Sequence, residues 1–268
     1  YNPIRVAAIS DAIMISTGTN NMAIIEQDSD VYVWGNNGSG ALGIGSSARD
    51  AVDTYISNDI DWIDFGGYSS YYLKEDGTLY SAGMNNYGQL GLGSTSNVSS
   101  FTQVKYEDGS EVKAKQIFAG GRNLIFTALD GKTYITGYNG YGQLSNGSTG
   151  NAIYPTVMRN IDNSELTDTI MLSTGDCIYD SVSRNSGVIR SDGTVWVSGD
   201  NSYGQIGNDT TVSSKYLIQS GETIVKLNAR NEYIKIGDTF DIDVLEADEF
   251  NVFIQDINQS DWTWTSSN

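Results

Sequence analysis

The sequence predicts an all-β fold, and three observations carry this prediction. The 268 residues include 30 Gly and 17 Tyr but only 2 Pro, a composition that suits twisted strands and tight turns. No window carries a long apolar stripe at helical spacing. A phrase of the form Gly-x-Asn-x-x-Gly-x-Leu/Ile also returns four times, and its copies begin at Gly35, Gly83, Gly137 and Gly199. Such recurrence indicates one supersecondary unit that is copied and stacked.

A β-hairpin is predicted ahead of each phrase. The first strands are expected at residues 22–26, 71–75, 124–129 and 187–190, and the second strand of each hairpin runs into the phrase. Three of the turns contain Asp-Gly, and these begin at Asp76, Asp130 and Asp192. Asp-Gly between apolar runs favours a type I′ turn, which needs positive φ at both central residues.

Further strands are predicted on both sides of the hairpin. A glycine opens three of the units (Gly18, Gly66 and Gly120), whereas the fourth has Val182 at that place. After the phrase, a polar loop leads to a short run that carries an aromatic residue. Three or four short strands in a unit of about 50 residues predict a β-propeller blade. We place the repeats at 4–58, 59–106, 107–160 and 161–221, and we expect these four to be part of a larger ring.

The unit that runs from Gly66 to Gly91 resembles the repeat of the regulator of chromosome condensation (RCC1) family. The resemblance covers roughly residues 4 to 220 and implies a propeller, which in that family usually has seven blades. The chain departs from the family pattern at two places. The histidine that commonly lies three residues after the opening glycine is replaced, and the tryptophan before the phrase survives only as Trp34. The replacements are Asn21, Ser69, Asn123 and Asn185.

Residues 222–268 follow a different pattern. Phe240, Ile242 and Val244 alternate with acidic residues, which predicts a half-buried strand. This segment, which ends in Trp-Thr-Ser-Ser-Asn, resembles the opening half of a group 2 bacterial immunoglobulin-like domain. The resemblance implies a place outside the cell, at a bacterial surface or in a phage virion.

Composition narrows the chemistry. The net charge of −18 is the wrong balance for a nucleic-acid backbone, so we expect no nucleic-acid partner. The chain has one Cys and no His, which excludes a Ser-His-Asp triad or a tetrahedral zinc site within one chain. No apolar run is long enough for a membrane span, so we expect no membrane insertion.

Carboxylates are the remaining candidates for catalysis or metal binding. The densest cluster in the repeats is Asp59, Asp61 and Asp64, and the first two share a strand face if the segment is extended. We expect solvated charges there. A Ca²⁺ site is the second interpretation, and a catalytic carboxylate pair of a polysaccharide lyase or hydrolase is the third. We expect no enzyme activity and no cofactor.

The glycine-rich phrase is expected to serve structure. Its glycines make turns, its Asn caps a turn, and its Leu or Ile packs between blades at Leu42, Leu90, Leu144 and Ile206. The recurring Tyr87, Tyr141 and Tyr203 are expected to pack as well. Partner contacts are instead expected in the variable loops 46–58, 94–100, 147–152 and 208–214. The candidate contact residues are Tyr55, Phe101, Tyr154 and Tyr216.

The leading functional hypothesis is a non-enzymatic binding or adhesion propeller, secreted or at a bacterial cell surface. It would present its loop rim to a protein or a glycan. The alternative is a structural component of a fibre or phage appendage, in which chains associate to complete the propeller or the fibre. A third hypothesis is an intracellular regulator that resembles an exchange factor.

Overall fold

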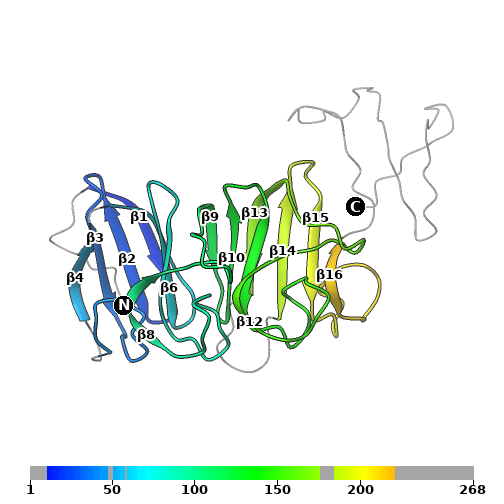
Figure 1. The fold of residues 1–268 in the computed structure, drawn as a ribbon, viewed down its shortest axis with the longest axis horizontal. Helices are drawn as coiled ribbons and strands as arrows, with labels where there is room; N and C mark the ends of the chain where they lie inside the picture. Colours follow the sequence, from blue (N-terminus) through cyan, green and yellow to red (C-terminus); the bar gives the residue numbers. More distant parts are fainter. Residues whose placement is uncertain (1–10, 48–50, 58, 176–183, 221–268) are drawn as a thin grey trace, which may run out of the picture. The chain divides into compact units, whose positions relative to one another are not determined.

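The structure, a computed structural model, describes residues 11–47, 51–57, 59–175 and 184–220 (Figure 1). This part of the chain contains sixteen strands and no helix. They form four separate sheets of four strands each. The all-β, four-blade organisation predicted from the sequence is therefore confirmed. The chain divides into residues 1–219 and 220–268, and the predicted immunoglobulin-like segment, 222–268, lies outside the described residues.

Each sheet is one blade, and its strands follow one another in the chain. Blade 1 holds β1 (Ala12–Thr17), β2 (Asn21–Glu26), β3 (Val31–Gly35) and β4 (Ala51–Ser57). Blade 2 holds β5 (Ile60–Phe65), β6 (Ser69–Lys74), β7 (Leu79–Gly83) and β8 (Val98–Gln103). Blade 3 holds β9 (Ala114–Ala119), β10 (Asn123–Ala128), β11 (Thr133–Gly137) and β12 (Ala152–Val157). Blade 4 holds β13 (Thr169–Thr174), β14 (Asn185–Arg190), β15 (Val195–Gly199) and β16 (Ser214–Gln219).

The hairpin between the second and third strand of each blade is present, but its turn is not type I′. In blade 2, Gly77 N donates to Lys74 O at 2.8 Å, and Lys74 N donates to Thr78 O at 3.0 Å. Of the Asp76-Gly77 pair only Gly77 has positive φ, at 81°. These features are typical of a type I turn followed by a glycine bulge. The Asp76 carboxylate favours this form because it accepts the Thr78 N–H at 2.9 Å, which fixes the turn from one side.

Two further hairpins were missed by the sequence analysis. They follow β8 and β12, and their turns have the same hydrogen bonds: Gly109 N donates to Tyr106 O and Asn163 N donates to Asn160 O, both at 2.9 Å. The signal was present in the first of them, since Asp108-Gly109 is the same dipeptide that marks the main hairpins.

The hydrophobic core lies between consecutive blades. Because successive strand residues point to opposite faces, each blade packs one face on the blade before it and the other on the blade after it. In β6, Tyr72 belongs to the cluster shared with blade 1, whereas Tyr71 and Leu73 belong to the cluster shared with blade 3. A third cluster joins blades 3 and 4 around Leu144. The expected packing between blades is confirmed for Leu42, Leu90 and Leu144, each of which belongs to one of these clusters. Ile206 is also fully buried.

A glycine after the first strand of each blade brings the blades close together. A Cβ built on Gly18 would lie 2.7 Å from Gly66 O, one on Gly66 would lie 2.3 Å from Gly120 O, and one on Gly120 would lie 2.8 Å from Gly175 O. The fourth member of this series is therefore Gly175, not the residue at 182, and the fourth repeat keeps its opening glycine. Sequence spacing misplaced it because the connection to β14 is longer in blade 4. Val182 itself lies outside the described residues.

Candidate binding surfaces

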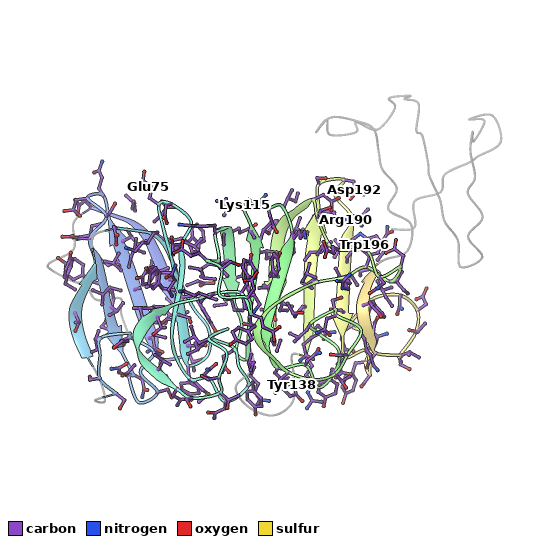
Figure 2. The ribbon with its side chains drawn as sticks, viewed as in Figure 1. Glu75, Lys115, Tyr138, Arg190, Asp192 and Trp196 are labelled. Carbon is purple, nitrogen blue, oxygen red and sulfur yellow. The ribbon has the colours of Figure 1, made fainter. Side chains whose placement is uncertain are left out.

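The two ends of the blades differ in the side chains that hold their turns. The main turns and the two added hairpins lie at one end, the hairpin rim, where Glu75 and Asp192 are seen in Figure 2. The glycine-rich loops 36–47, 84–97, 138–151 and 200–213 lie at the opposite end, the glycine-loop rim, where Tyr138 is seen.

On the glycine-loop rim, a buried asparagine is the centre of each loop. Asn85 accepts the Leu90 N–H at 2.9 Å and donates to Ser94 O and Ser96 O at 2.9 and 3.1 Å. Asn37, Asn139 and Asn201 accept the equivalent N–H groups in the other loops. The expected capping role of the asparagine is confirmed.

Acidic groups are segregated to the hairpin rim. The carboxylates that lie in or beside its turns are Glu26, Asp28, Asp30, Glu75, Asp76, Glu107, Asp108, Asp130, Asp162 and Asp192. The described residues of the four glycine-rich loops include two carboxylates, Asp200 and Asp209. Among the described residues, the turn carboxylates are thus concentrated at the hairpin rim.

Five side chains form a continuous cluster on the glycine-loop rim, which we call the Tyr–Arg ladder: Tyr87, Arg122, Tyr138, Tyr141 and Arg184. The Arg122 guanidinium carbon lies 4.8 Å from the Tyr87 ring centre and 5.6 Å from that of Tyr138. The ring centres of Tyr138 and Tyr141 are 6.3 Å apart. Arg184 lies 4.1 Å from the Tyr141 ring centre and donates to its hydroxyl. The five residues come from blades 2, 3 and 4, and all are partly exposed.

Among the described residues, neither arginine of the ladder forms an ion pair with a carboxylate, although Asp200 interacts electrostatically with Arg184. Arg159 and Arg190 are paired with Glu165 and Asp168. In contrast, no described carboxylate forms an ion pair with Arg122 or Arg184. A guanidinium held on aromatic rings keeps its N–H edge free for a planar anion such as a carboxylate.

The expectation that all three recurring tyrosines pack is only partly confirmed. Tyr87 and Tyr141 contact arginines of the following blade, but Tyr203 is 90% exposed. The difference follows from position, because no described blade follows blade 4 and supplies an arginine to Tyr203.

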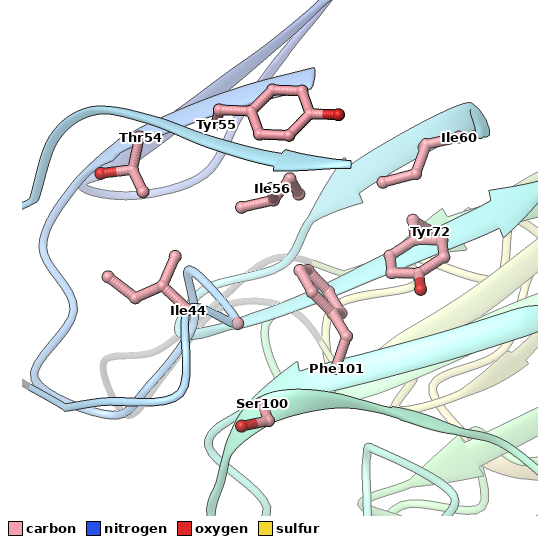
Figure 3. A pocket seen from close by; sticks show the side chains of 9 residues that line it. Ile44, Thr54, Tyr55, Ile56, Ile60, Tyr72, Ser100 and Phe101 are labelled. Carbon is pink, nitrogen blue, oxygen red and sulfur yellow. The ribbon is translucent and has the colours of Figure 1, made fainter. Parts of the chain in front are cut away.

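A groove of about 420 Å³ lies between the outer strands of blades 1 and 2 (Figure 3). Its walls include Tyr55 of β4 and Phe101 of β8, so the structure brings together two of the four predicted contact residues. Tyr55 is 49% exposed, and burial together with the nearby Asp30 carboxylate raises the pKa of its hydroxyl. Tyr72 closes the groove floor with its ring centre 4.7 Å from that of Phe101.

The other two predicted contact residues lie in the next two seams between blades. Tyr154 of β12 lies against Gly93 of blade 2, and Tyr216 of β16 lies against Gly147 of blade 3. Both are partly buried, and neither joins the groove. A partner-binding role for the four aromatic residues stays a prediction.

The three aspartates of the proposed Ca²⁺ or catalytic cluster have separate environments. Asp59 pairs with Lys74 at 2.5 Å, and Asp61 is exposed. Asp64 accepts the Ser16 hydroxyl at 3.1 Å and the Ala119 N–H at 2.8 Å, so it links blades 1, 2 and 3. Within the described ranges, no group of three carboxylate or thiol side chains is arranged as metal ligands. The same ranges contain no helix that could cross a membrane.

The chain is similar to one protein-family model and to several solved structures. Residues 76–126 match the model of the regulator of chromosome condensation (RCC1) repeat. The match runs from the β6–β7 turn of blade 2 into β10 of blade 3, so the sequence repeat is offset from the structural blade.

Three solved structures are similar to the chain. Prp20p from Saccharomyces cerevisiae, studied with its binding to Gsp1p and histones, has a TM-score of 0.64 at 16% identity, covering 79% of this chain and 51% of Prp20p. Yeast RCC1 (Prp20) bound by Kap60 gives 0.61 at 16% identity, with 79% and 49% covered. Human WBSCR16 gives 0.63 at 20% identity, with 82% and 54% covered. The chain thus spans about half the length of these structures. With its four antiparallel four-stranded blades, the chain carries a β-propeller fold of the RCC1-like type.

Proposed function

We propose that the protein is a non-enzymatic binding propeller whose glycine-loop rim holds a protein partner through carboxylates of that partner. The Tyr–Arg ladder is the observation that supports this proposal. Neither arginine forms an ion pair with a described carboxylate, although Asp200 interacts with Arg184 through space and the chain as a whole is strongly acidic. Each incoming carboxylate would meet a guanidinium group that is already held in place by a tyrosine ring, so little side-chain entropy would be lost on binding.

Two further points favour a protein over a glycan as the partner. The ring faces of Tyr87 and Tyr141 are covered by arginine, which leaves them poorly placed for stacking on a neutral sugar ring. Proteins of the same fold, such as Prp20p, are described with protein partners. A bacterial cell-surface or secreted setting is part of the proposal and rests on the resemblance of residues 222–268 to an immunoglobulin-like domain.

The test measures binding of an acidic probe, the peptide acetyl-(Glu-Gly)₄-amide, to the whole chain by interferometry. We expect saturable binding that weakens as salt rises. The double variant Arg122→Ala/Arg184→Ala should lose about tenfold or more in affinity, because charge-assisted hydrogen bonds are removed. The matched control is Arg159→Ala/Arg190→Ala, which removes the two paired arginines of the hairpin rim and should leave the affinity unchanged. Equal loss in both double variants, or no loss in either, contradicts the proposal.

A second candidate function, a structural component that self-associates, is favoured by an exposed apolar residue on blade 1. Ile15 of β1 is 63% exposed, whereas Ile63, at the same register in blade 2, is fully buried. If this face of blade 1 joins copies of the chain, sedimentation should show an oligomer that Ile15→Glu converts to monomer, while a wild-type monomer at high concentration contradicts this candidate.

A further inference from the structure

The three seams between blades share one hydrogen bond but differ in the side chains beside it, and the groove lies in the first seam. In each seam, a glycine of one blade donates its N–H to a carbonyl on the outer strand of the next blade. Gly45 N donates to Ser99 O at 2.8 Å, Gly93 N to Ile153 O at 2.9 Å and Gly147 N to Lys215 O at 3.0 Å. The residue that follows the accepting carbonyl is Ser100, Tyr154 or Tyr216.

The strand registers give the same equivalence. Thr102 pairs with Ser81 of β7, and Thr156 pairs with Ile135 at the same place in β11. Ser100 and Tyr154 lie two residues before these positions. The hydroxymethyl group of Ser100 therefore stands where the next seam has a phenol.

The tyrosines fill their seams. A Cβ built on Gly93 would lie 2.3 Å from the Tyr154 hydroxyl oxygen, and one built on Gly147 would lie 2.4 Å from that of Tyr216. At Gly45, the nearest side-chain atom is Ser100 Oγ at 3.6 Å. Because Ser100 lines the groove, the first seam lacks at the edge of the groove the tyrosine ring that the other two seams carry.

The lining of the groove suits an aromatic ring with a polar edge. Ile44, Ile56 and Ile60 provide apolar walls, and Phe101 offers a ring. Hydroxyl groups of Thr54 and Ser100 lie at the same groove, as Figure 3 shows. The Tyr72 ring makes an edge contact with Phe101. It also stacks on the Tyr80 ring, with 4.7 Å between the two ring centres, and these contacts hold the aromatic wall in place.

We propose that this groove binds the aromatic side chain of a tyrosine-like residue that an extended segment of a partner protein inserts between blades 1 and 2. An extended segment is favoured because the residues that fill the equivalent seams, Tyr154 and Tyr216, are themselves carried on strands. This site is separate from the Tyr–Arg ladder and uses none of its residues. Its occupant is recognised by shape and aromatic contact rather than by charge.

The test uses two capped peptides, acetyl-Gly-Tyr-Gly-amide and acetyl-Gly-Ala-Gly-amide, together with p-cresol as the bare phenol. Binding is followed by the NMR signals of the Phe101 and Tyr72 rings in the whole chain. The tyrosine peptide should bind about tenfold or more tightly than the alanine peptide, because it buries an aromatic ring. Ser100→Tyr should abolish binding of both p-cresol and the tyrosine peptide. The control Thr102→Tyr adds the same side chain at a nearby exposed position outside the groove, and it should bind like the wild type.

A gain-of-site variant keeps the proposal falsifiable if Ser100→Tyr fails to fold. Tyr154→Ser should open a second groove, so that p-cresol binds with two sites instead of one and perturbs signals near Gly93. The proposal is overturned if the wild type does not distinguish the two peptides, if Ser100→Tyr still binds, or if Tyr154→Ser gains no site. Binding of p-cresol without the tyrosine peptide overturns the assignment of a protein segment as the occupant. All of these results are independent of the arginine variants, so this site and the ladder can fail separately.

Discussion

The two rims of the blades solve the same local problem with different side chains. Each has turns in which a side-chain oxygen accepts a backbone N–H. On the glycine-loop rim the acceptor is a buried asparagine such as Asn85, and on the hairpin rim it is an exposed aspartate such as Asp76. An amide can be buried between blades because it is neutral and can also donate, whereas a carboxylate remains where water or a lysine can reach it.

The two rims therefore contribute differently: one supplies buried hydrogen bonds, and the other holds exposed carboxylates. The glycine-loop rim carries buried hydrogen bonds from its asparagines, and its described loops hold few carboxylates. The hairpin rim holds most of the described turn carboxylates. The comparison yields two predictions, which concern the buried amide and then the exposed carboxylate.

The largest expected effect is for Asn85→Ala. This change removes the acceptor of the Leu90 N–H and the donors to Ser94 O and Ser96 O, and it leaves a buried N–H without its partner. We expect the free energy of unfolding to fall by about 3 kcal/mol. Urea unfolding followed by tryptophan fluorescence measures it. The matched control is Asn86→Ala, one residue away and exposed, which should change the unfolding free energy little. Similar losses in the two variants would mean that the buried asparagine has no special role in the stability of the glycine-loop rim.

The smaller expected effect is on the melting temperature in acid, to which Asp76 contributes. Hydrogen bonds from Lys113 and Thr78 lower the pKa of this carboxyl from its ordinary value of 3.8. A lowered pKa in the folded state stabilises the protein above the unfolded-state pKa, and this stability is lost as the pH falls through the folded-state pKa. The melting temperature of the wild type should therefore fall from about pH 4 downward. Asp76→Asn should start lower but decline less over the same range.

Thermal melts at a series of pH values check this prediction. Glu75→Gln is the neighbouring control, because no hydrogen bond or ion pair is recorded for that exposed side chain among the described residues. It should keep the acid dependence of the wild type. An Asp76→Asn profile parallel to that of the wild type would mean that the turn carboxylates of the hairpin rim do not set the acid response.

The fold was largely predictable because its signals are local. Hairpins, capping asparagines and interblade leucines follow from turn chemistry and from strand alternation within one repeat. The predicted type I′ turn was wrong because the Asp76 carboxylate accepts the Thr78 N–H, which a type I′ turn would use for its own backbone hydrogen bond. The place of the fourth opening glycine was wrong because counting along the chain assumes equal connections, and only strand pairing aligns Gly175 with Gly120.

The binding surfaces were much less predictable. Arg122 and Arg184 belong to no sequence motif. Their role as candidate binding residues is visible only in the structure, where tyrosines of the preceding blade contact them. Tyr55 and Phe101 were predicted as contact residues, but nothing in the sequence indicated that they share a groove. That Ser100 replaces a tyrosine of the other blades became clear only after the strand registers were aligned.

By itself, the sequence determined an all-β chain of four repeated blades, the residues that make its turns and the leucines that fill its seams. These follow from interactions within about 50 residues, which recur in every copy. Only the tertiary structure decided which tyrosines are covered by arginine, which described arginines form no ion pair and which seam holds a groove. These properties depend on the contact between one blade and the next, where differences such as Ser100 for tyrosine distinguish the first seam from the other two.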